Sequence, residues 1–347
     1  MADVCVEWQA LQQFTARIFE RLGMPPADAA LEAEVLVWAN LRGIDSHGVQ
    51  RVAEYARRVD DGGMNPRPDI RIVRQSPAAL LIEADHAFGP VVTVFAVEQV
   101  VSRAAQMGVG WALIRNTTHQ GAIGYYTELI ARRGMAGIAV VCNPPNMAPT
   151  GARVPGVHNS PIAISVPGGV HATLTLDMAT SVAAGGKLQV AVDKGSSIPP
   201  EWALDRDGRP TTDPGQAVSL QPAGSYKGYG LALLFECLSS LMVANPLLVP
   251  SLGGQGVPSG TQNGFVVALD ISFFTDVEGY RAGVDEVVAA VKGLPLAPDA
   301  AEILVPGERE ERMCQERLRQ GIPLPPGTVE KLRSVGQRFG LPLPPGL

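Results

Sequence analysis

The chain has 347 residues, of which 46% are hydrophobic and 18% are charged, so it can form a large core and is not a disordered chain. Its net charge is −6, and only 5% of its residues are aromatic. These values exclude the basic surface and the stacking platforms that nucleic-acid binding requires, and they predict a globular protein without a nucleic-acid partner.

The cysteines and the hydropathy pattern indicate the compartment. The four cysteines, at positions 5, 142, 237 and 314, are far apart in the sequence, which argues against a disulfide framework or a zinc cluster. No pair of His, Asp or Glu residues has metal-binding spacing, so we expect no metal site. Residues 229–249 are the most apolar stretch, but Glu236 and a proline within it favour a buried helix. We therefore expect a cytoplasmic protein with no membrane partner.

Residues 7–60 are predicted to be helical. Apolar residues at helical spacing over 11–22 indicate a first helix, and a pair of prolines then begins a second helix that runs through Leu41. The segment 42–48 is rich in glycine and small polar residues and is expected to interrupt the helices. A third helix is expected to continue through Tyr55.

From about residue 70, short β-type runs alternate with helical segments. This alternation is typical of an α/β protein with a layered sheet. Strands are expected at 79–82, 111–114, 137–142, 162–166, 173–176 and 264–271, and helices at 89–107, 122–134, 228–244, 277–292 and 308–320.

The common nucleotide-binding motifs are missing from this α/β pattern. The GYG of residues 228–230 has Leu233 in place of the third glycine of GxGxxG, which the Rossmann fold requires. The GK of residues 186–187 is followed by Leu188 rather than by the Ser or Thr of a P-loop. A nucleotide must therefore bind through another loop geometry.

The first candidate site is the segment 45–48 (DSHG), followed by Arg51. The imidazole of His47 suits proton transfer near neutral pH, and the guanidinium of Arg51 suits a carboxylate. Two other interpretations stay open. Ser46 either caps a helix start or pairs with His47 in a Ser–His hydrolase, although the GxSxG motif of that class would need glycine at Ile44.

The second candidate is His119, in a segment (117–124) that joins a predicted strand to a predicted helix. Such a junction leaves backbone N–H groups at a helix N-terminus, where a phosphate or carboxylate binds favourably. A histidine in a loop of this kind favours a functional role. The alternative is an ordinary hydrogen-bonded turn.

Two further candidates lie at a strand end and at a helix start. Asp177 ends a predicted strand, and it is either a site carboxylate or a capping residue. Lys227 enters a strongly apolar helix, where it either binds an anion or extends its ammonium group to solvent. His86 and His171 lie among loop residues, and we expect both to be structural.

Several of these segments together resemble the type-2 malate/L-lactate dehydrogenase family, whose members are NAD(P)-dependent oxidoreductases unrelated in fold to the Rossmann lactate dehydrogenases. The resemblance covers nearly the whole chain. It explains the missing GxGxxG, because this family binds its nicotinamide cofactor on a different scaffold. The motifs are RGIDSHGVQRV (42–52), THQGAIGYY (118–126), LTLDMATS (174–181), IPPEWALDRDGRPTTDP (198–214), KGYGLALL (227–234) and PGERE (306–310).

The resemblance implies a non-Rossmann, three-layer α/β/α fold with a mixed sheet and a helical region formed by the N- and C-terminal segments. Residues 1–75 would form the helical N-terminal region and pack with the C-terminal helical tail, 295–347. Residues 76–294 would form the α/β region that binds cofactor and substrate. A homodimer with the active site near the subunit interface is also implied.

The resemblance further implies roles for individual residues. In the family, the Ser-His pair that corresponds to Ser46 and His47 stands beside the nicotinamide, and the histidine is the proton donor. In the ureidoglycolate dehydrogenase branch the acid/base residue corresponds to His119, so both histidines stay candidates. Arg51 and Asn143 are the implied substrate contacts. The implied cofactor contacts are Thr173, Leu174, Thr175, Leu176, Asp177, Met178, Ala179, Tyr226, Lys227, Gly307, Glu308 and Arg309.

The implied reaction is reversible hydride transfer between NAD or NADP and a small 2-oxo or 2-hydroxy acid of the malate, lactate or ureidoglycolate type. The alternative is an NADPH-dependent reductase of a cyclic imine such as piperideine-2-carboxylate or pyrroline-2-carboxylate. The chain departs from the family at residues 158–161, which read HNSP where many relatives carry Gly-Thr-Asn-Pro. Because the threonine of that motif helps to hold substrate in some members, the resemblance leaves the particular acid open.

Overall fold

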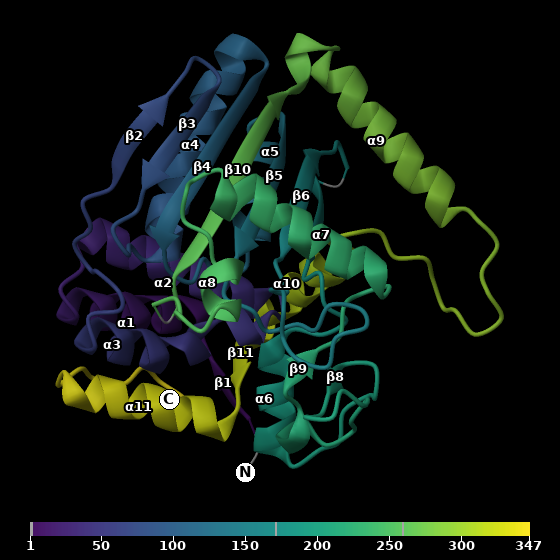
Figure 1. Ribbon diagram of the computed structural model, residues 1–347. Coiled ribbons are helices and arrows are strands. Elements are labelled where there is room, and N and C mark those ends of the chain that lie inside the picture. The colour runs from purple at the N-terminus through teal and green to yellow at the C-terminus, as the bar shows by residue number, and fades with distance from the viewer. Residues whose placement is uncertain (1–2, 171, 259) are drawn as a thin grey trace.

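The structure is a computed structural model that describes residues 3–170, 172–258 and 260–347, so His171 lies outside the described residues. A seven-stranded sheet with helices on both faces forms the centre of the molecule (Figure 1). Strands β3 and β4 are parallel and the other neighbours are antiparallel, which confirms the predicted mixed sheet. In sheet order the strands are β2 (Arg71–Gln75), β3 (Ala79–Glu83), β4 (Val109–Thr117), β10 (Gln262–Asp270), β5 (Met135–Cys142), β6 (Ile162–Pro167) and β7 (Thr173–Met178).

One face of the sheet is covered by α4 (Gly89–Met107) and α5 (Gly124–Ala131). Their apolar residues and those of the sheet form one buried cluster. The helix and the sheet approach each other very closely at Gly110, where a Cβ atom would lie 2.1 Å from the carbonyl oxygen of Val100. Glycine at this position therefore sets the spacing of the two layers.

The other face is covered by α7 (Tyr226–Glu236) and by a wider π turn that follows it (Cys237–Leu241). The predicted single helix over 228–244 is thus wrong in its second half. The backbone changes there from α-helical to π-helical geometry, and the carboxylate of Glu236 accepts hydrogen bonds from the backbone at Leu247 and Leu248. The two covered faces confirm the three-layer α/β/α arrangement.

The N- and C-terminal segments pack into one helical region, as predicted (Figure 1). Strand β1 (Val4–Val6) pairs with β11 (Ile322–Leu324), which ties the two ends of the chain together. Around this pair lie α1 (Trp8–Arg21), α2 (Pro26–Leu41), α3 (Val52–Asp60), α10 (Glu308–Gln320) and α11 (Pro326–Arg338).

Three smaller parts complete the fold. Helix α6 (Gly185–Lys194) lies with the short pair β8 (Ala203–Leu204) and β9 (Ser219–Leu220), and α8 (Leu248–Leu252) is a short helix after α7. Helix α9 (Val277–Lys292) extends away from the body at the upper right of Figure 1. None of the helices in the described part of the chain is long and apolar enough to cross a membrane.

Candidate active site

A cavity of about 2230 Å³ opens between the helical region, one edge of the sheet and α6. Its wall brings together residues from segments that are far apart in the sequence. All five of the catalytic and substrate-binding residues expected from the sequence line this cavity: Ser46, His47, Arg51, His119 and Asn143.

Two short 3-10 turns, Asp45–His47 and Val49–Arg51, present the SHG segment to the cavity. The carboxylate of Asp45 accepts hydrogen bonds from Asn40 of α2 (2.7 Å) and from the guanidinium of Arg317 of α10 (2.7 and 3.0 Å). The side-chain oxygen of Asn40 in turn accepts from the backbone N–H of Val49 (2.8 Å). Helices from both ends of the chain therefore hold this segment in place.

His47 and His119 form a stacked pair at the cavity wall. Their ring centroids are 5.3 Å apart and the planes are inclined by 24°, and the Oγ of Ser46 lies 2.9 Å from Nδ1 of His47. Burial, with a smaller effect of the Arg51 charge, lowers the pKa of His47 from 6.5 to about 4. Burial also lowers the pKa of His119 well below its usual value, helped by Arg51, His47 and Arg58. Both imidazoles are therefore neutral at pH 7.

Contacts to Nδ1 of His119 determine where its proton lies. The backbone N–H of Gly121 donates to this nitrogen (3.3 Å), so Nδ1 is the unprotonated nitrogen of the ring. The hydroxyl group of Tyr55 lies 2.5 Å from the same nitrogen and must donate to it. The proton of the neutral ring is consequently on Nε2, and His119 is a hydrogen-bond donor through that atom.

Arg51 is held in place by two of its three guanidinium nitrogens. Nε donates to the backbone oxygen of Ser46 and Nη1 donates to the carboxylate of Glu54, both at 2.8 Å. The third nitrogen, Nη2, faces the start of α6, because a Cβ atom on Gly186 would lie 3.8 Å from it. Arg51 is thus preorganised, with one nitrogen directed at the space beside α6.

Asp177 occupies the helix N-terminus at which the sequence suggested an anion site. Its Oδ2 accepts the backbone N–H of Gly124, the first residue of α5, at 2.7 Å. Asp177 therefore caps a helix that precedes it by many residues, and the expected exogenous anion at α5 is replaced by this side chain. Burial, with Glu310 and Glu128, raises the pKa of Asp177 to about 6.

The implied cofactor residues divide into two groups. Thr175, Leu176, Asp177, Met178, Ala179, Gly307 and Arg309 line the cavity. Thr173, Leu174, Tyr226, Lys227 and Glu308 are not part of that lining. Lys227 is exposed, and the carboxylate of Glu308 is hydrogen-bonded to Lys292 and Arg312, which lowers its pKa to about 2.

The sequence reasoning missed the N-terminus of α6, where Gly185, Gly186 and Lys187 line the cavity. A Cβ atom on Gly186 would lie 2.8 Å from Cβ of Ser46, so glycine permits this helix end to approach the SHG segment. The sequence signal for this site is the GK pair of residues 186–187, which does not match the P-loop pattern. A helix N-terminus beside Arg51 creates a positive potential suited to a carboxylate or phosphate.

The residues of the segment 158–161, where the chain departs from the family motif, lie partly at the cavity and partly in the core. Asn159 lines the cavity, whereas His158 and Ser160 are completely buried. Asn159 and Asn146 exchange two hydrogen bonds, of 2.9 and 2.8 Å, and Asn146 also lines the cavity. The cavity therefore has an amide-rich wall formed by Asn143, Asn146 and Asn159.

The sequence of residues 6–333 matches the family described as Malate/L-lactate dehydrogenase. The chain belongs to this family. Like other malate/L-lactate dehydrogenase family members, it is an oxidoreductase, and family membership accounts for the non-Rossmann sheet. The SHG segment and the loop of His119, which are far apart in this family member's sequence, meet at one cavity.

Three similar proteins illustrate the match. The L-sulfolactate dehydrogenase of Methanocaldococcus jannaschii is 37% identical, over 92% of this chain and 92% of that protein. The ureidoglycolate dehydrogenase (NAD(+)) of Escherichia coli K12 is 32% identical, over 91% of each chain. The crystal structure of malate dehydrogenase from Entamoeba histolytica superimposes with a TM-score of 0.93 at 26% identity, covering 98% of this chain and 99% of that one.

Proposed function

We propose that the enzyme transfers hydride reversibly between NAD(P)H and the C2 carbon of a small 2-oxo or 2-hydroxy acid. The observation that carries this proposal is the meeting of His47, His119 and Arg51 at one wall of a large cavity. Reduction of such an acid needs a cation for the carboxylate and a donor for the oxygen that gains negative charge. The three side chains supply both.

The cavity residues fit a nicotinamide dinucleotide. About 2230 Å³ exceeds the ~300–1,000 Å³ of an ordinary small-molecule pocket, so a dinucleotide and an acid have room together. Gly307 has a positive φ of 86°, and a Cβ atom there would lie 3.1 Å from the backbone oxygen of Thr175. Glycine therefore allows the two backbone segments to pack closely at this part of the cavity wall. Arg309 and Lys187 provide positive charge for phosphates. When bound, the nicotinamide exchanges the hydride.

Arg51 and α6 together are proposed to hold the substrate carboxylate. Nη2 of Arg51 faces the N-terminus of α6, and Gly186 permits the close approach of that helix end to Ser46. A carboxylate between them would receive a charge-assisted hydrogen bond and the favourable helix dipole. The amide groups of Asn143 and Asn159 would then contact the remainder of the acid, which makes them candidates for selecting among substrates.

The two histidines are proposed to have different chemical roles in the reaction. His119 carries its proton on Nε2 and is neutral, so it donates a hydrogen bond that stabilises charge on the reacting oxygen. His47 exchanges the proton, with Ser46 orienting its ring through Nδ1. Two positive charges on the stacked imidazoles would repel each other, so at most one of the two rings is an imidazolium at a time.

An assay of cofactor absorbance tests the reaction. Wild-type protein, His47→Ala and His119→Ala are incubated with NADH or NADPH and pyruvate, oxaloacetate, 2-oxoglutarate or a cyclic imine acid, and in the oxidative direction with malate, lactate, sulfolactate or ureidoglycolate. We expect turnover of at least one acid and a loss of about 10²- to 10⁴-fold in a histidine variant. Absence of both turnover and cofactor binding by wild-type protein would overturn the proposal.

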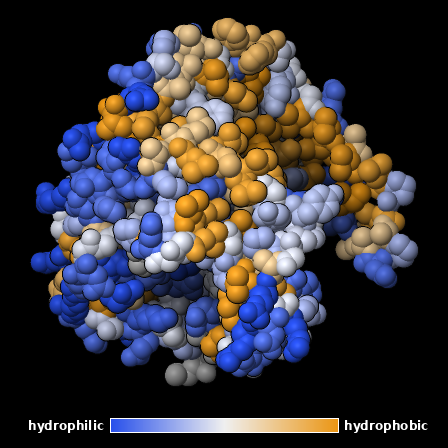
Figure 2. Space-filling view, viewed as in Figure 1, coloured by the Kyte–Doolittle hydropathy of each residue, from blue (hydrophilic) through white to orange (hydrophobic). Residues whose placement is uncertain are grey.

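We also propose that the enzyme is a homodimer. Apolar side chains are exposed between α7 and α9, on the right of the view in Figure 2. Among the described side chains of α9, only Val288 is buried. Helix α9, which extends from the body, can cover the same apolar surface on a second copy of the chain. In a two-fold symmetric dimer, each copy would cover this surface on the other. The exposed residues are Leu231, Leu233, Leu234, Leu238, Leu241, Met242, Phe273, Phe274, Val287 and Val291.

Light scattering tests the dimer. Leu234→Glu places a charge in the proposed interface and is expected to give a monomer, whereas Val73→Glu, at an exposed position of β2, is the matched control and is expected to stay dimeric. A monomeric wild-type protein would contradict the proposal. All four cysteines are free, and on this ground we also propose a reducing, cytoplasmic location.

A further inference from the structure

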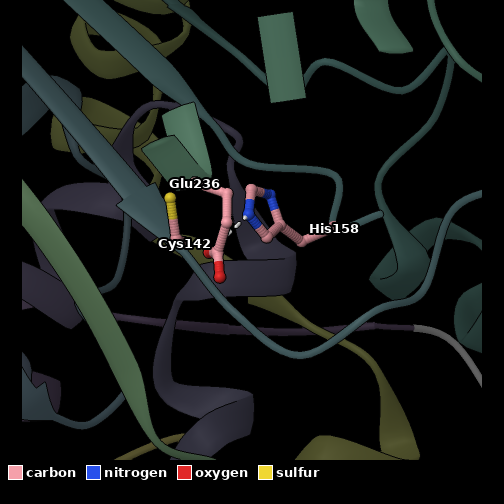
Figure 3. A group of neighbouring side chains, drawn as sticks. All are labelled: Cys142, His158 and Glu236. Carbon is pink, nitrogen blue, oxygen red and sulfur yellow. Dashed lines mark hydrogen bonds and ion pairs between the residues drawn. The ribbon is translucent and has the colours of Figure 1, made fainter. Parts of the chain in front are cut away.

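Three metal-ligating side chains meet in the core beneath the cavity wall (Figure 3). Cys142 ends β5, His158 precedes β6 and Glu236 ends α7, and one ligand atom of each lies within 4.8 Å of the others. At most 4% of any of these residues is exposed. Their neighbours Asn143 and Asn159 line the cavity, so the cluster lies directly behind the proposed substrate site.

A chain of hydrogen bonds orients the imidazole of His158 for metal binding. The hydroxyl group of Ser160 donates to the sulfur of Cys142 (3.6 Å), so the oxygen of Ser160 accepts from Nδ1–H of His158. Nε2 faces Glu236, to which it donates when it is protonated, and a bound cation would take the place of that proton. Metal-binding histidines are typically held by such a partner on the second ring nitrogen.

The carboxylate of Glu236 is oriented in the same way. Its Oε1 accepts the backbone N–H groups of Leu247 (2.8 Å) and Leu248 (3.1 Å). Oε2 is therefore the oxygen that faces the cluster, at 3.4 Å from Nε2 of His158. Hydrogen bonds to the distal oxygen are the usual support of a carboxylate ligand.

The distance between Nε2 of His158 and Oε2 of Glu236 fits two ligands of one ion. A charge-assisted hydrogen bond between such groups is about 2.7–2.9 Å long, which is shorter than the 3.4 Å found here. Two ligands bonded to tetrahedral zinc at about 2.0–2.1 Å lie about 3.3–3.4 Å apart. The 3.4 Å separation therefore matches both a long hydrogen bond and two ligands of one tetrahedral ion.

The charge of the cluster also favours a cation. Within the described residues, no Lys or Arg side chain forms an ion pair with Glu236. Its ion-pair partner is the imidazole of His158, which compensates the charge of the carboxylate only while the ring is protonated. A divalent cation, the thiolate of Cys142 and the carboxylate of Glu236 sum to zero charge, so metal binding would make the buried group neutral.

We propose that Cys142, His158 and Glu236 bind Zn²⁺ or a similar borderline divalent cation. Nitrogen, sulfur and carboxylate oxygen are the donors that zinc uses in proteins, and three protein ligands leave a fourth position for water. The ion would join the end of β5 and the end of α7 to the segment before β6. It would thereby hold Asn143 and Asn159 in the cavity wall.

Metal content and cobalt spectroscopy of the full-length protein test this site. The purified protein is stripped with a chelator, reloaded with Zn²⁺ or Co²⁺, dialysed and measured by elemental analysis, with the thermal midpoint recorded before and after. We expect one ion per chain, a lower midpoint for stripped protein, and a thiolate-to-cobalt charge-transfer band in the near ultraviolet. These readouts do not depend on dehydrogenase activity, so they stand apart from the proposed reaction.

Variants assign the ligands. Cys142→Ser is expected to abolish the cobalt–thiolate band, and Cys314→Ser, at another buried cysteine, is the matched control that keeps it. Glu236→Gln retains an oxygen for Leu247 and Leu248 and is expected to weaken metal binding at least tenfold. Failure of wild-type protein to retain zinc or cobalt after reloading would overturn the proposal, and so would a cobalt–thiolate band that persists in Cys142→Ser. In the first case His158 and Glu236 form an ordinary buried ion pair.

Discussion

The imidazole rings of His47 and His119 lie stacked with their centroids 5.3 Å apart, although the two residues belong to segments far apart in the chain. Their outer partners differ. Ser46 contacts Nδ1 of His47, and Tyr55 contacts Nδ1 of His119. Because partial burial of each ring, together with the nearby charge of Arg51, disfavours the imidazolium form, each histidine has a lowered pKa. The pair therefore has two neutral imidazoles with different hydrogen-bond partners, which leads to the first two predictions.

Removing the histidines singly and together should show that they act as a unit. We expect His47→Ala and His119→Ala each to lower kcat/KM by about 10²- to 10⁴-fold, and the double variant to lose little more than the worse single variant. Steady-state kinetics with the substrate found in the screen measures this. Losses that multiply fully in the double variant would contradict coupled roles.

The lowered pKa of His47 predicts that kcat/KM falls at an unusually low pH on the acid side of its pH profile. The neutral ring accepts the proton from a hydroxy acid, and with a folded-state pKa of about 4 it stays neutral down to that pH. We expect kcat/KM for oxidation to hold through pH 6.5 and to fall only as the pH approaches 4. In Arg51→Met the nearby positive charge is removed, which raises the pKa of His47, so the fall in kcat/KM should occur at a higher pH. A fall in the kcat/KM of wild-type protein centred at pH 6.5 would refute the assignment of His47 as the proton-exchanging group.

Arg51→Lys tests the carboxylate contact. The lysine keeps the charge but loses the planar fork that contacts Ser46 and Glu54 while directing Nη2 at α6. We expect kcat/KM to fall by about 10- to 100-fold, mainly through KM, since a charged hydrogen bond contributes about 1.5–3 kcal/mol. The matched control is Arg338→Lys, which changes an exposed ion pair with Asp60 outside the cavity. Equal kinetics for the Arg51 variant and wild type would exclude this contact.

Asp177→Asn is expected to stabilise the protein at alkaline pH. The folded-state pKa of Asp177 is raised to about 6 from 3.8, so its favourable contribution is fully present below pH 3.8 and is lost as the pH rises through 6. Asparagine keeps an oxygen for the N–H of Gly124 and does not ionise.

Urea unfolding at fixed protein concentration checks this effect. The stability gain of Asp177→Asn over wild type should be larger at pH 8 than at pH 4.5, because the Asp177 carboxyl of the native wild-type protein is ionised at pH 8 and largely protonated at pH 4.5. A gain that is the same at both pH values, or an equal loss, would show that ionisation of Asp177 is not the cause.

Much of the fold followed from local patterns. The helices over 89–107 and 277–292 have the predicted bounds, and the strand over 137–142 differs only at its start, because helical and strand periodicity are carried by neighbouring residues. The three-residue strands β1 and β11 are too short to show alternation and form only by pairing with each other. Helix α6 begins with two glycines, which mask its helical pattern.

The site shows the same division. Ser46, His47 and Arg51 lie close together in the sequence, so one motif sufficed to predict that they share a site. The cap that Asp177 provides for α5, the contact of Tyr55 with His119, and the cluster of Cys142, His158 and Glu236 join residues far apart in the chain. Such pairings depend on how the layers pack, since burial brings polar groups together and obliges each to find a partner, and no local pattern of residues encodes that choice.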